Sequence, residues 1–357
     1  MTRLLRSMAE FAAFQLGLSR LPFALTRLVH RRYTLAVFVY HRVVDRPQTA
    51  GFYTDYDRGL DAAVFANHLD ALQKHFQLVN LAEFIDLVSG QQPLTRHSAL
   101  VTFDDADSEF ITHALPALTQ RNIPAVMMAP TSLIDTKDQL WHVRVSNIMR
   151  HVTDDHWSTF RQRLNEWPQP VAEIVGAHES PGPVADRRDL CRSINFALDR
   201  VHPSLVNRMI ESWEGIVAPG SPLPIWCMTW DDLRHIEAGG VAVESHTEKH
   251  YKLPMVSDAD VRCELVNSRA QLEARLGKRI RAIAYPQGRY EQRVGETAAA
   301  AGYQVGFTTV RSFCPYPRTG LDMFSIPRID IHGDTRGQID LHLARIGVQC
   351  LLKIVPW

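Results

Sequence analysis

The hydrophobic positions of this chain follow two patterns that alternate from residue 33 onward. Short runs of β-branched and aromatic residues, such as YTLAVFVY at 33–40, predict strands that are buried on both faces. Between these runs, apolar residues recur at helical spacing, as at Val64, Leu69, Leu72 and Phe76. Strands and helices that alternate with short connections are typical of a parallel α/β architecture.

The alternation predicts enough strands and helices to form a barrel. The expected strands cover 33–40, 98–103, 124–129, 241–243, 281–285, 303–308 and 324–331. The expected helices cover 61–76, 81–88, 108–120, 229–235, 258–276 and 291–301. We therefore expect an α/β fold in the form of a distorted (β/α)7-type barrel.

One long stretch, residues 136–225, departs from this alternation. It is richer in Arg, His, Trp and Pro, and it predicts an inserted, largely helical subdomain. The insertion separates a first part of the barrel, residues 33–135, from a second part, residues 226–335. Residues 336–357 are expected to add a closing amphipathic helix.

Residues 1–32 have the pattern of a basic amphipathic helix, with six arginines and a single acid, Glu10. Such a helix either packs on the outside of the domain or lies on an anionic membrane surface. Glu10, Gln15 and Arg20 interrupt every apolar stretch, so a secretory signal is not predicted. We expect a cytoplasmic protein, with peripheral contact to the inner membrane as the second role open to this segment.

Composition narrows the class of protein. The chain has 357 residues, with 39 Lys plus Arg against 39 Asp plus Glu. This zero net charge argues against a nucleic-acid partner that is bound through many phosphates. No run approaches the roughly 20 apolar residues that cross a bilayer. The five scattered cysteines contain no CxxC pair and predict reduced thiols.

Two adjacent carboxylates, Asp104 and Asp105, directly follow the expected strand 98–103. Neighbouring carboxylates at a strand end are unfavourable, because like charges repel and desolvation disfavours both. A metal ion or a shared proton relieves this cost. A helix cap is the structural alternative, but Asp107 or Ser108 is the better cap of the next helix.

Two histidines, His246 and His250, follow the expected strand 241–243. On a helical turn, this spacing places both imidazoles on one face, which is the usual geometry for two ligands of one metal ion. Because the carboxyl ends of barrel strands converge, a carboxylate of the Asp104–Asp105 pair can complete a His-His-Asp set. Three ligands and an open position are typical of catalytic zinc, although mixed N/O ligation also suits harder metals.

A third polar segment, 285–288 with the sequence YPQG, follows the expected strand 281–285. Pro and Gly after a strand predict a sharp turn. Such a turn either aims a backbone N–H at a developing oxyanion or simply ends the strand.

These segments together resemble a known family. VTFDD at 101–105, SHTEKH at 245–250 and AYPQG at 284–288 are similar, in order and setting, to the motifs of the polysaccharide deacetylase family. Its members are the NodB-like enzymes, also called family-4 carbohydrate esterases. An early YHRV at 40–43 resembles the exopolysaccharide deacetylase branch. The resemblance covers the two barrel parts and excludes the insertion and both ends.

The resemblance implies a role for each matching acid and histidine. Asp104 corresponds to the catalytic base of the family. Asp105, His246 and His250 correspond to the ligands of a divalent metal ion, for which zinc is expected first and cobalt, nickel or manganese are alternatives.

The resemblance also implies an oxyanion segment and a general acid. The turn that contains Tyr285 and Gln287 corresponds to the segment whose backbone helps to hold the oxyanion. The general acid of the family is a histidine at a strand end. His41 resembles this residue, and His332, which also follows a strand, is its rival.

The sequence departs from the family pattern at several positions. The usual Gly after the acidic pair is Ala106, which is tolerable if φ stays negative. The Arg that orients the catalytic carboxylate in the family is replaced by Ala284. We expect Arg328 to take over its role, with an ordinary surface salt bridge as the alternative. Gln287 replaces a Tyr and Glu244 replaces a Gly, which leaves the substrate open.

The expected function is therefore hydrolysis of the N-acetyl amide of an N-acetylhexosamine in a polysaccharide or a lipid-linked saccharide. A deformylase or amidase that acts on another amino sugar or a small amide is an alternative. A catalytically silent glycan-binding barrel is another. Retention of Asp104, Asp105, His246 and His250 argues against the silent barrel, because unpaired carboxylates have no structural use there. The oligomeric state is not predicted.

Overall fold

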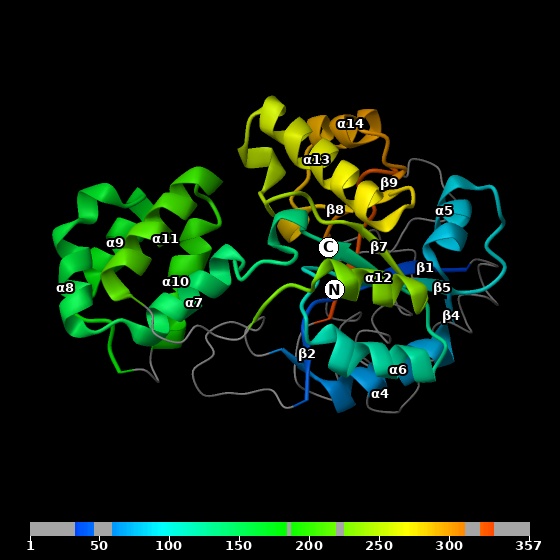
Figure 1. Cartoon of the computed structure of the whole chain (residues 1–357), viewed down its shortest axis with the longest axis horizontal. Coiled ribbons are helices and arrows are strands. Elements are labelled where there is room, and N and C mark those ends of the chain that lie inside the picture. Colours follow the sequence, from blue (N-terminus) through cyan, green and yellow to red (C-terminus); the bar gives the residue numbers. More distant parts are fainter. Residues whose placement is uncertain (1–32, 46–58, 184–186, 219–224, 311–321, 332–357) are drawn as a thin grey trace, which may run out of the picture.

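The fold is an α/β barrel around a parallel sheet (Figure 1). The computed structural model describes residues 33–45, 59–183, 187–218, 225–310 and 322–331. The strand order is β10-β1-β5-β6-β7-β8-β9, and a short β4 pairs with β5. The strands of this sheet are β1 Leu35–Tyr40, β4 Gln77–Leu78, β5 Ser98–Phe103, β6 Ala125–Ala129, β7 Val241–Ser245, β8 Ala282–Ala284, β9 Val305–Phe307 and β10 Ile329–Asp330. A separate parallel pair joins β2 Val43–Val44 to β3 Leu60–Asp61.

The two edges of the sheet approach each other through one short segment. In β10, Ile329 pairs with Phe38 of β1. Three residues earlier, Ile326 forms a parallel bridge with Phe307 of β9. The sheet therefore curls into a distorted barrel, as the sequence predicts. The expected strand 324–331 is shorter than predicted, because Pro327 has no N–H to donate to a neighbouring strand.

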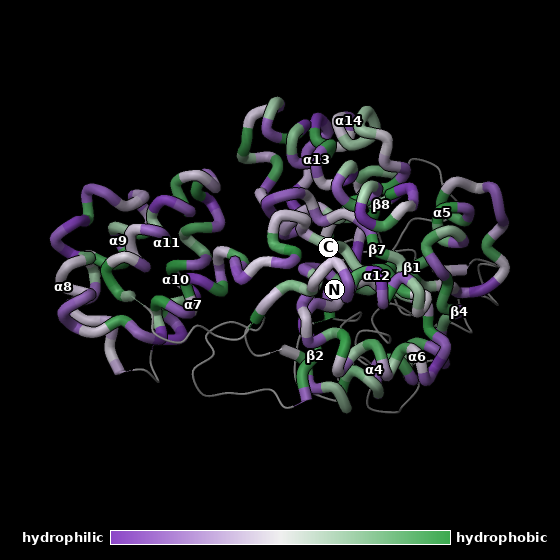
Figure 2. The backbone as a smooth tube through the Cα atoms, in the orientation of Figure 1, coloured by the Kyte–Doolittle hydropathy of each residue, from purple (hydrophilic) through white to green (hydrophobic). Residues whose placement is uncertain are grey.

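Burial explains the hydrophobic runs. Every residue of β1, β5 and β6 is buried, because helices cover the outside of the sheet and side chains fill its inside. Figure 2 shows these hydrophobic stretches within the barrel. The covering helices are α4 Ala62–His75, α5 Leu81–Ser89, α6 Leu115–Gln120, α12 Trp230–Ala238, α13 Asp258–Leu276 and α14 Gln292–Ala300.

The expected helix 108–120 is divided in the structure. A π-helical turn, η1 (Phe110–Ala114), comes first, and α6 begins only at Leu115. Pro116 lies in the first turn of α6, where its missing N–H leaves no helical hydrogen bond unmade.

A separate helical unit lies beside the barrel (Figure 1). Its helices fall within the expected insertion and are α7 Trp141–His151, α8 Asp154–Gln162, α9 Gln169–Ala177, α10 Arg187–Leu198 and α11 Pro203–Val217. This helical unit has its own hydrophobic core, in which Phe160 stacks on Trp213 at a centroid distance of 4.4 Å. The helical unit is therefore packed around a core that is separate from that of the barrel.

Some predictions fall outside the described residues. They are the basic helix 1–32, the closing helix 336–357 and the rival general acid His332. Within the described part of the chain, no helix combines the length and the apolarity needed to cross a membrane.

Candidate active site

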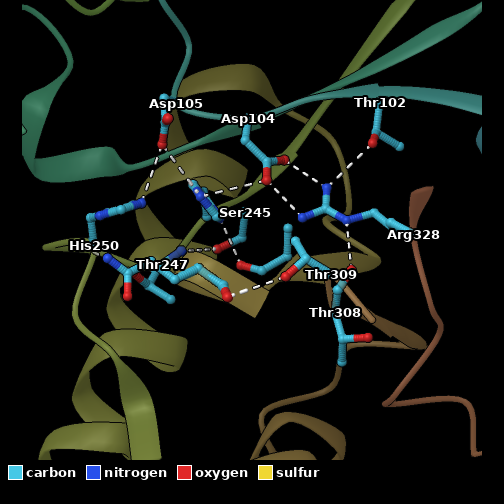
Figure 3. A network of polar contacts seen from close by, with 12 residues as sticks. Thr102, Asp104, Asp105, Ser245, Thr247, His250, Thr308, Thr309 and Arg328 are labelled. Carbon is cyan, nitrogen blue, oxygen red and sulfur yellow. Dashed lines mark hydrogen bonds and ion pairs between the residues drawn. The ribbon is translucent and has the colours of Figure 1, made fainter. Parts of the chain in front are cut away.

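The polar motifs converge at one end of the barrel strands (Figure 3). Asp104 and Asp105 follow β5, His246 follows β7, and Tyr285 follows β8. Arg328 directly precedes β10. Since neighbouring parallel strands end at the same edge, residues from distant parts of the chain come into contact here.

Asp105, His246 and His250 form a buried group of three converging ligands. One ligand atom from each lies within 4.8 Å of the others. Asp105 Oδ1 lies 3.4 Å from His246 Nε2 and 3.2 Å from His250 Nε2. This oxygen is buried and makes no hydrogen bond with either ring. Two imidazole nitrogens and a carboxylate oxygen that converge without hydrogen bonds fit a single divalent cation.

A hydrogen bond to the neighbouring strand orients His246. The Ala284 carbonyl, in β8, accepts a hydrogen bond of 2.8 Å from His246 Nδ1. Because Nδ1 therefore carries the proton, Nε2 presents its lone pair toward Asp105. The Nδ1 atom of His250 has no hydrogen-bond partner among the described residues, so only its position in the loop orients this ring.

The loop that carries the two histidines is not a helical turn, contrary to the prediction. Residues 246–250 contain no helical turn, and Thr247 and His250 adopt φ values of 68° and 57°. The Glu264 carboxylate accepts hydrogen bonds from the N–H groups of Glu248 (3.0 Å) and Lys249 (2.8 Å). These contacts fold the loop back, so the two imidazole centroids lie 4.8 Å apart.

Left-handed backbone is concentrated in this site. Of the eight non-glycine residues with positive φ in the described part of the chain, five lie in the three motifs: Asp105, Ala106, Thr247, His250 and Gln287. Each such residue costs about 1–3 kcal/mol, and this strain is typical of functional sites. At Ala106, φ is 51°, so the condition of a negative φ at this position is not met.

Arg328 holds Asp104 in a bidentate contact. Arg328 Nη1 donates to Asp104 Oδ1 at 2.7 Å, and Nη2 donates to Oδ2 at 2.6 Å. The guanidinium also donates to the Thr308 carbonyl (3.0 Å) and to Thr102 Oγ1 (3.3 Å). Arg328 is 0% exposed, so the alternative of a surface salt bridge is wrong. The contact with the acid is the one expected for an orienting arginine.

The charges around Asp104 favour its ionised form. Burial opposes ionisation, but Arg328 and His246 outweigh it and lower the pKa of Asp104 below its usual value. Asp104 Oδ2 also lies 3.9 Å from His246 Nε2, so this oxygen faces the three-ligand group. The site therefore contains a fixed carboxylate that can accept a proton next to a candidate metal position.

The three ligands differ in their protonation. Burial opposes ionisation of Asp105, but the two imidazoles hold its pKa well below the usual range. Burial also lowers the pKa of His250, and its effect outweighs the opposing effects of Asp105 and Asp104. At His246, Asp104 and Asp105 together outweigh burial and raise the pKa. The lowered pKa of His250 favours its neutral form, whereas the raised pKa of His246 favours its protonated form, so a cation at this site would compete with a proton for His246.

The third motif offers one backbone N–H rather than two. The Tyr285 N–H donates to the Phe307 carbonyl at 3.0 Å within the sheet, so it is unavailable for an oxyanion, contrary to expectation. Pro286 has no N–H, and the Gly288 N–H donates to the Tyr285 carbonyl at 2.8 Å. Gln287, which adopts φ 55°, remains the candidate donor of this turn.

The turn depends on a glycine at position 288. A Cβ atom at Gly288 (φ 66°) would overlap with the side chain and the backbone nitrogen of Thr309. At Gly277, φ is 67° and nothing lies within 4 Å of a Cβ atom, which makes it a matched control.

We expect Gly277→Ala to cost about 1–2 kcal/mol of unfolding free energy from backbone strain. Gly288→Ala should cost about 1–3 kcal/mol more from overpacking. Urea unfolding measures both, and equal losses would contradict a crowded turn.

Two further histidines, His41 and His142, interact electrostatically with residues of the candidate active site. His41 follows β1, is half-buried, and its charge acts on the Asp104 carboxyl. His142, at the start of α7, was not among the predicted site residues. Burial lowers its pKa to about 4, and the charges of Asp105, His250 and His41 also act on it. The charges of the site therefore reach a residue of the helical unit. Because the insertion shows no motif and the chain has 16 histidines, the sequence carries no signal for this role.

Comparison with known proteins supports the second and third motifs, because the family match includes residues 245–250 and 284–288 but not 101–105. Residues 202–306 match the family model described as polysaccharide deacetylase. A curated relative, the putative polysaccharide deacetylase YxkH of Bacillus subtilis, is 28% identical over 82 residues. This match covers 23% of the present chain and spans only 29% of the length of YxkH.

Solved structures share the fold over most of the chain. IcaB from Ammonifex degensii matches with a TM-score of 0.56 at 18% identity, covering 88% of this chain and 98% of that one. The Streptococcus pyogenes deacetylase PplD, in complex with acetate, matches with a TM-score of 0.54 at 16% identity, covering 84% and 92%. BA0330 from Bacillus anthracis, described as a putative polysaccharide deacetylase, gives 0.54 at 15% identity, covering 88% and 69%. At such identities, the agreement is one of fold.

Proposed function

We propose that this chain hydrolyses the N-acetyl amide of an N-acetylhexosamine in a polysaccharide or a lipid-linked saccharide, as expected from its similarity to the NodB-like polysaccharide deacetylase family. One observation carries this proposal. The buried, ionised Asp104 is fixed by Arg328 next to the three converging ligands Asp105, His246 and His250. A general base beside a candidate metal position is an arrangement that activates water for amide hydrolysis.

The three ligands support a metal-dependent reaction. Asp105, His246 and His250 would hold a divalent cation, and zinc suits two imidazoles and one carboxylate with a position left open. When bound, such a cation supplies water activation and polarisation of the amide carbonyl. Cobalt, nickel and manganese are the alternatives to zinc.

The residues of the chain then move protons and stabilise charge. Asp104 Oδ2 accepts a proton from the attacking water, while Arg328 keeps the carboxylate anionic and in place. The Gln287 N–H donates to the developing oxyanion. His41 gives a proton to the leaving amine nitrogen, since an imidazole both holds and releases a proton near neutral pH. The C–N bond breaks, a C–O bond forms, and the products are acetate and the free amine.

An acetate-release assay tests the proposed function. Protein stripped with a chelator is reloaded separately with Zn²⁺, Co²⁺, Ni²⁺ or Mn²⁺ and given N-acetylglucosamine oligosaccharides. We expect acetate release from the loaded protein, loss of release on chelation, and recovery when metal is restored.

A parallel reaction with N-formylated sugars serves as the comparison. Faster release of formate than of acetate would replace deacetylation by deformylation. No release of either acid, together with no bound metal, would overturn the enzyme proposal and favour a silent glycan-binding barrel.

A further inference from the structure

A cavity of about 510 Å³ lies where the helical unit meets the barrel. Its walls include Trp141 of α7 and Asn207 of α11 on one side, and Trp226 and Tyr251 on the other. His250 also lines the cavity, so the cavity adjoins the three-ligand group. The volume lies within the range of about 300–1,000 Å³ that is usual for ligand sites.

Contacts around Asp199 attach the helical unit to the barrel at this place. Lys252 Nζ lies 3.4 Å from Asp199 Oδ1 and donates to the Leu198 carbonyl at 2.9 Å. Arg289 forms a second ion pair with Asp199. The Lys252 ammonium also lies 4.9 Å from the centroid of the Trp141 ring. Because Lys252 is only two residues from His250, the cavity wall and the candidate active site are positioned by the same loop.

The charges of the cavity wall are nearly balanced. Arg144 donates to both carboxylate oxygens of Glu214, at 2.8 and 2.7 Å, and Lys252 is paired with Asp199. The other charged residues of the wall are two lysines and two acids: Lys137, Lys249, Asp138 and Glu211. Four cationic residues and three acids line the cavity, and Asp199, next to the wall, neutralises the fourth cation, Lys252. This near balance favours a neutral, hydroxyl-rich ligand over a phosphate or pyrophosphate group.

The aromatic residues of the wall suit a sugar ring. Trp141, Trp226 and Tyr251 are each half-buried, so part of each ring surface remains accessible. A sugar presents apolar ring faces and polar hydroxyls, and the combination of aromatic rings with an amide such as Asn207 matches both.

We propose that this cavity binds a neutral sugar unit of the same glycan, next to the unit whose acetyl group is removed. The inference rests on the proposed function and refines it, because it places part of the glycan-binding surface on the helical unit, outside the barrel. It also gives the helical unit a role, since this unit supplies one wall of the cavity.

The length dependence of acetate release tests this inference. The measured quantity is kcat/KM for the N-acetylglucosamine tetrasaccharide divided by kcat/KM for the monosaccharide. The wild-type ratio should be well above one. Trp226→Ala should lower the ratio about three- to tenfold, the loss of one aromatic contact. The ratio is independent of how much of the variant is folded, because this fraction cancels.

Phe196→Ala is the matched control. Phe196 belongs to the same helical unit but lies outside the cavity wall, and it is 64% exposed. Its removal should leave the ratio unchanged. If the wild type hydrolyses both sugars and Trp226→Ala keeps the wild-type ratio, the sugar-binding cavity is refuted.

A binding measurement separates failure of the cavity from failure of the enzyme proposal. Calorimetry on the Asp104→Asn protein should show tetrasaccharide binding, and adding Trp226→Ala should weaken it by the same factor. If the wild type releases no acetate but this binding pattern holds, the cavity stands and the proposed function falls. If inorganic pyrophosphate binds more tightly than the tetrasaccharide and Trp226→Ala has no effect, the neutral-sugar assignment is overturned.

Discussion

Asp104→Asn is expected to lower the rate of acetate release by about 10²–10⁴-fold, the usual contribution of a positioned general base. The asparagine amide does not accept a proton from water, although it occupies nearly the same volume. Asp105, His246 and His250 are unchanged, so the variant should still bind metal. The measurements are kcat with an N-acetylglucosamine oligosaccharide and the metal content of the same sample.

Asp231→Asn is the control for this change. Asp231 lies in α12, its side chain is 89% exposed, and it pairs with Arg234 three residues later. The same loss of a carboxylate at this surface position should leave kcat unaltered. If Asp104→Asn keeps its metal and also keeps more than a third of the wild-type rate, another group must accept the proton.

The barrel architecture, and the convergence of the three motifs at one site, can be predicted from the local sequence pattern. The runs 33–40 and 98–103 read as strands because they are apolar without interruption, and β1 and β5 are indeed buried throughout. Asp104 and Asp105 directly follow β5, and His246 directly follows β7. In a parallel barrel this position alone places Asp105 near His246, although the two residues are far apart in the sequence.

The local geometry of the site did not follow from the sequence. A spacing of four residues fits one turn of helix, but the same spacing also fits the loop of His246–His250, in which two residues are left-handed. The choice is made by Glu264 of α13, which binds the loop backbone from 15 and 16 residues away. Similarly, the Tyr285 N–H is engaged only because β9 pairs with β8, a contact that sequence pattern does not reveal.

Contacts between the barrel and the helical insertion are the part of the structure that is least predictable from the sequence. Nothing in the run of residues around His142 distinguishes it from the other histidines of the chain. The charges of the site act on His142, which is in a helical unit that ion pairs of Asp199 with Lys252 and Arg289 attach to the barrel. Such long-range packing depends on the folded surfaces of both parts rather than on local propensity.

Arg328→Met is expected to lower the free energy of unfolding by about 3–5 kcal/mol, because it removes one partner of a buried ion pair. Methionine fills much of the arginine volume, so the main loss is electrostatic. Asp104, itself only 2% exposed, would be left as an unpaired buried carboxylate. In the double variant Arg328→Met/Asp104→Asn that charge is gone, so the loss should be clearly smaller than the sum of the two single losses. Urea unfolding of all four proteins measures this coupling.

The surface pair Arg234–Asp231 provides the matched cycle. These side chains are 48% and 89% exposed, so Arg234→Met, Asp231→Asn and their combination should show a coupling of at most about 1 kcal/mol. If the buried pair gave no larger coupling than this surface pair, Arg328 would not be the group that stabilises ionised Asp104. If Arg328→Met also retained wild-type acetate release, the orienting role would fail independently of stability. If Arg328 holds Asp104 as the base, we expect both a large coupling and a loss of acetate release. The same two hydrogen bonds then determine the charge and the orientation of the carboxylate.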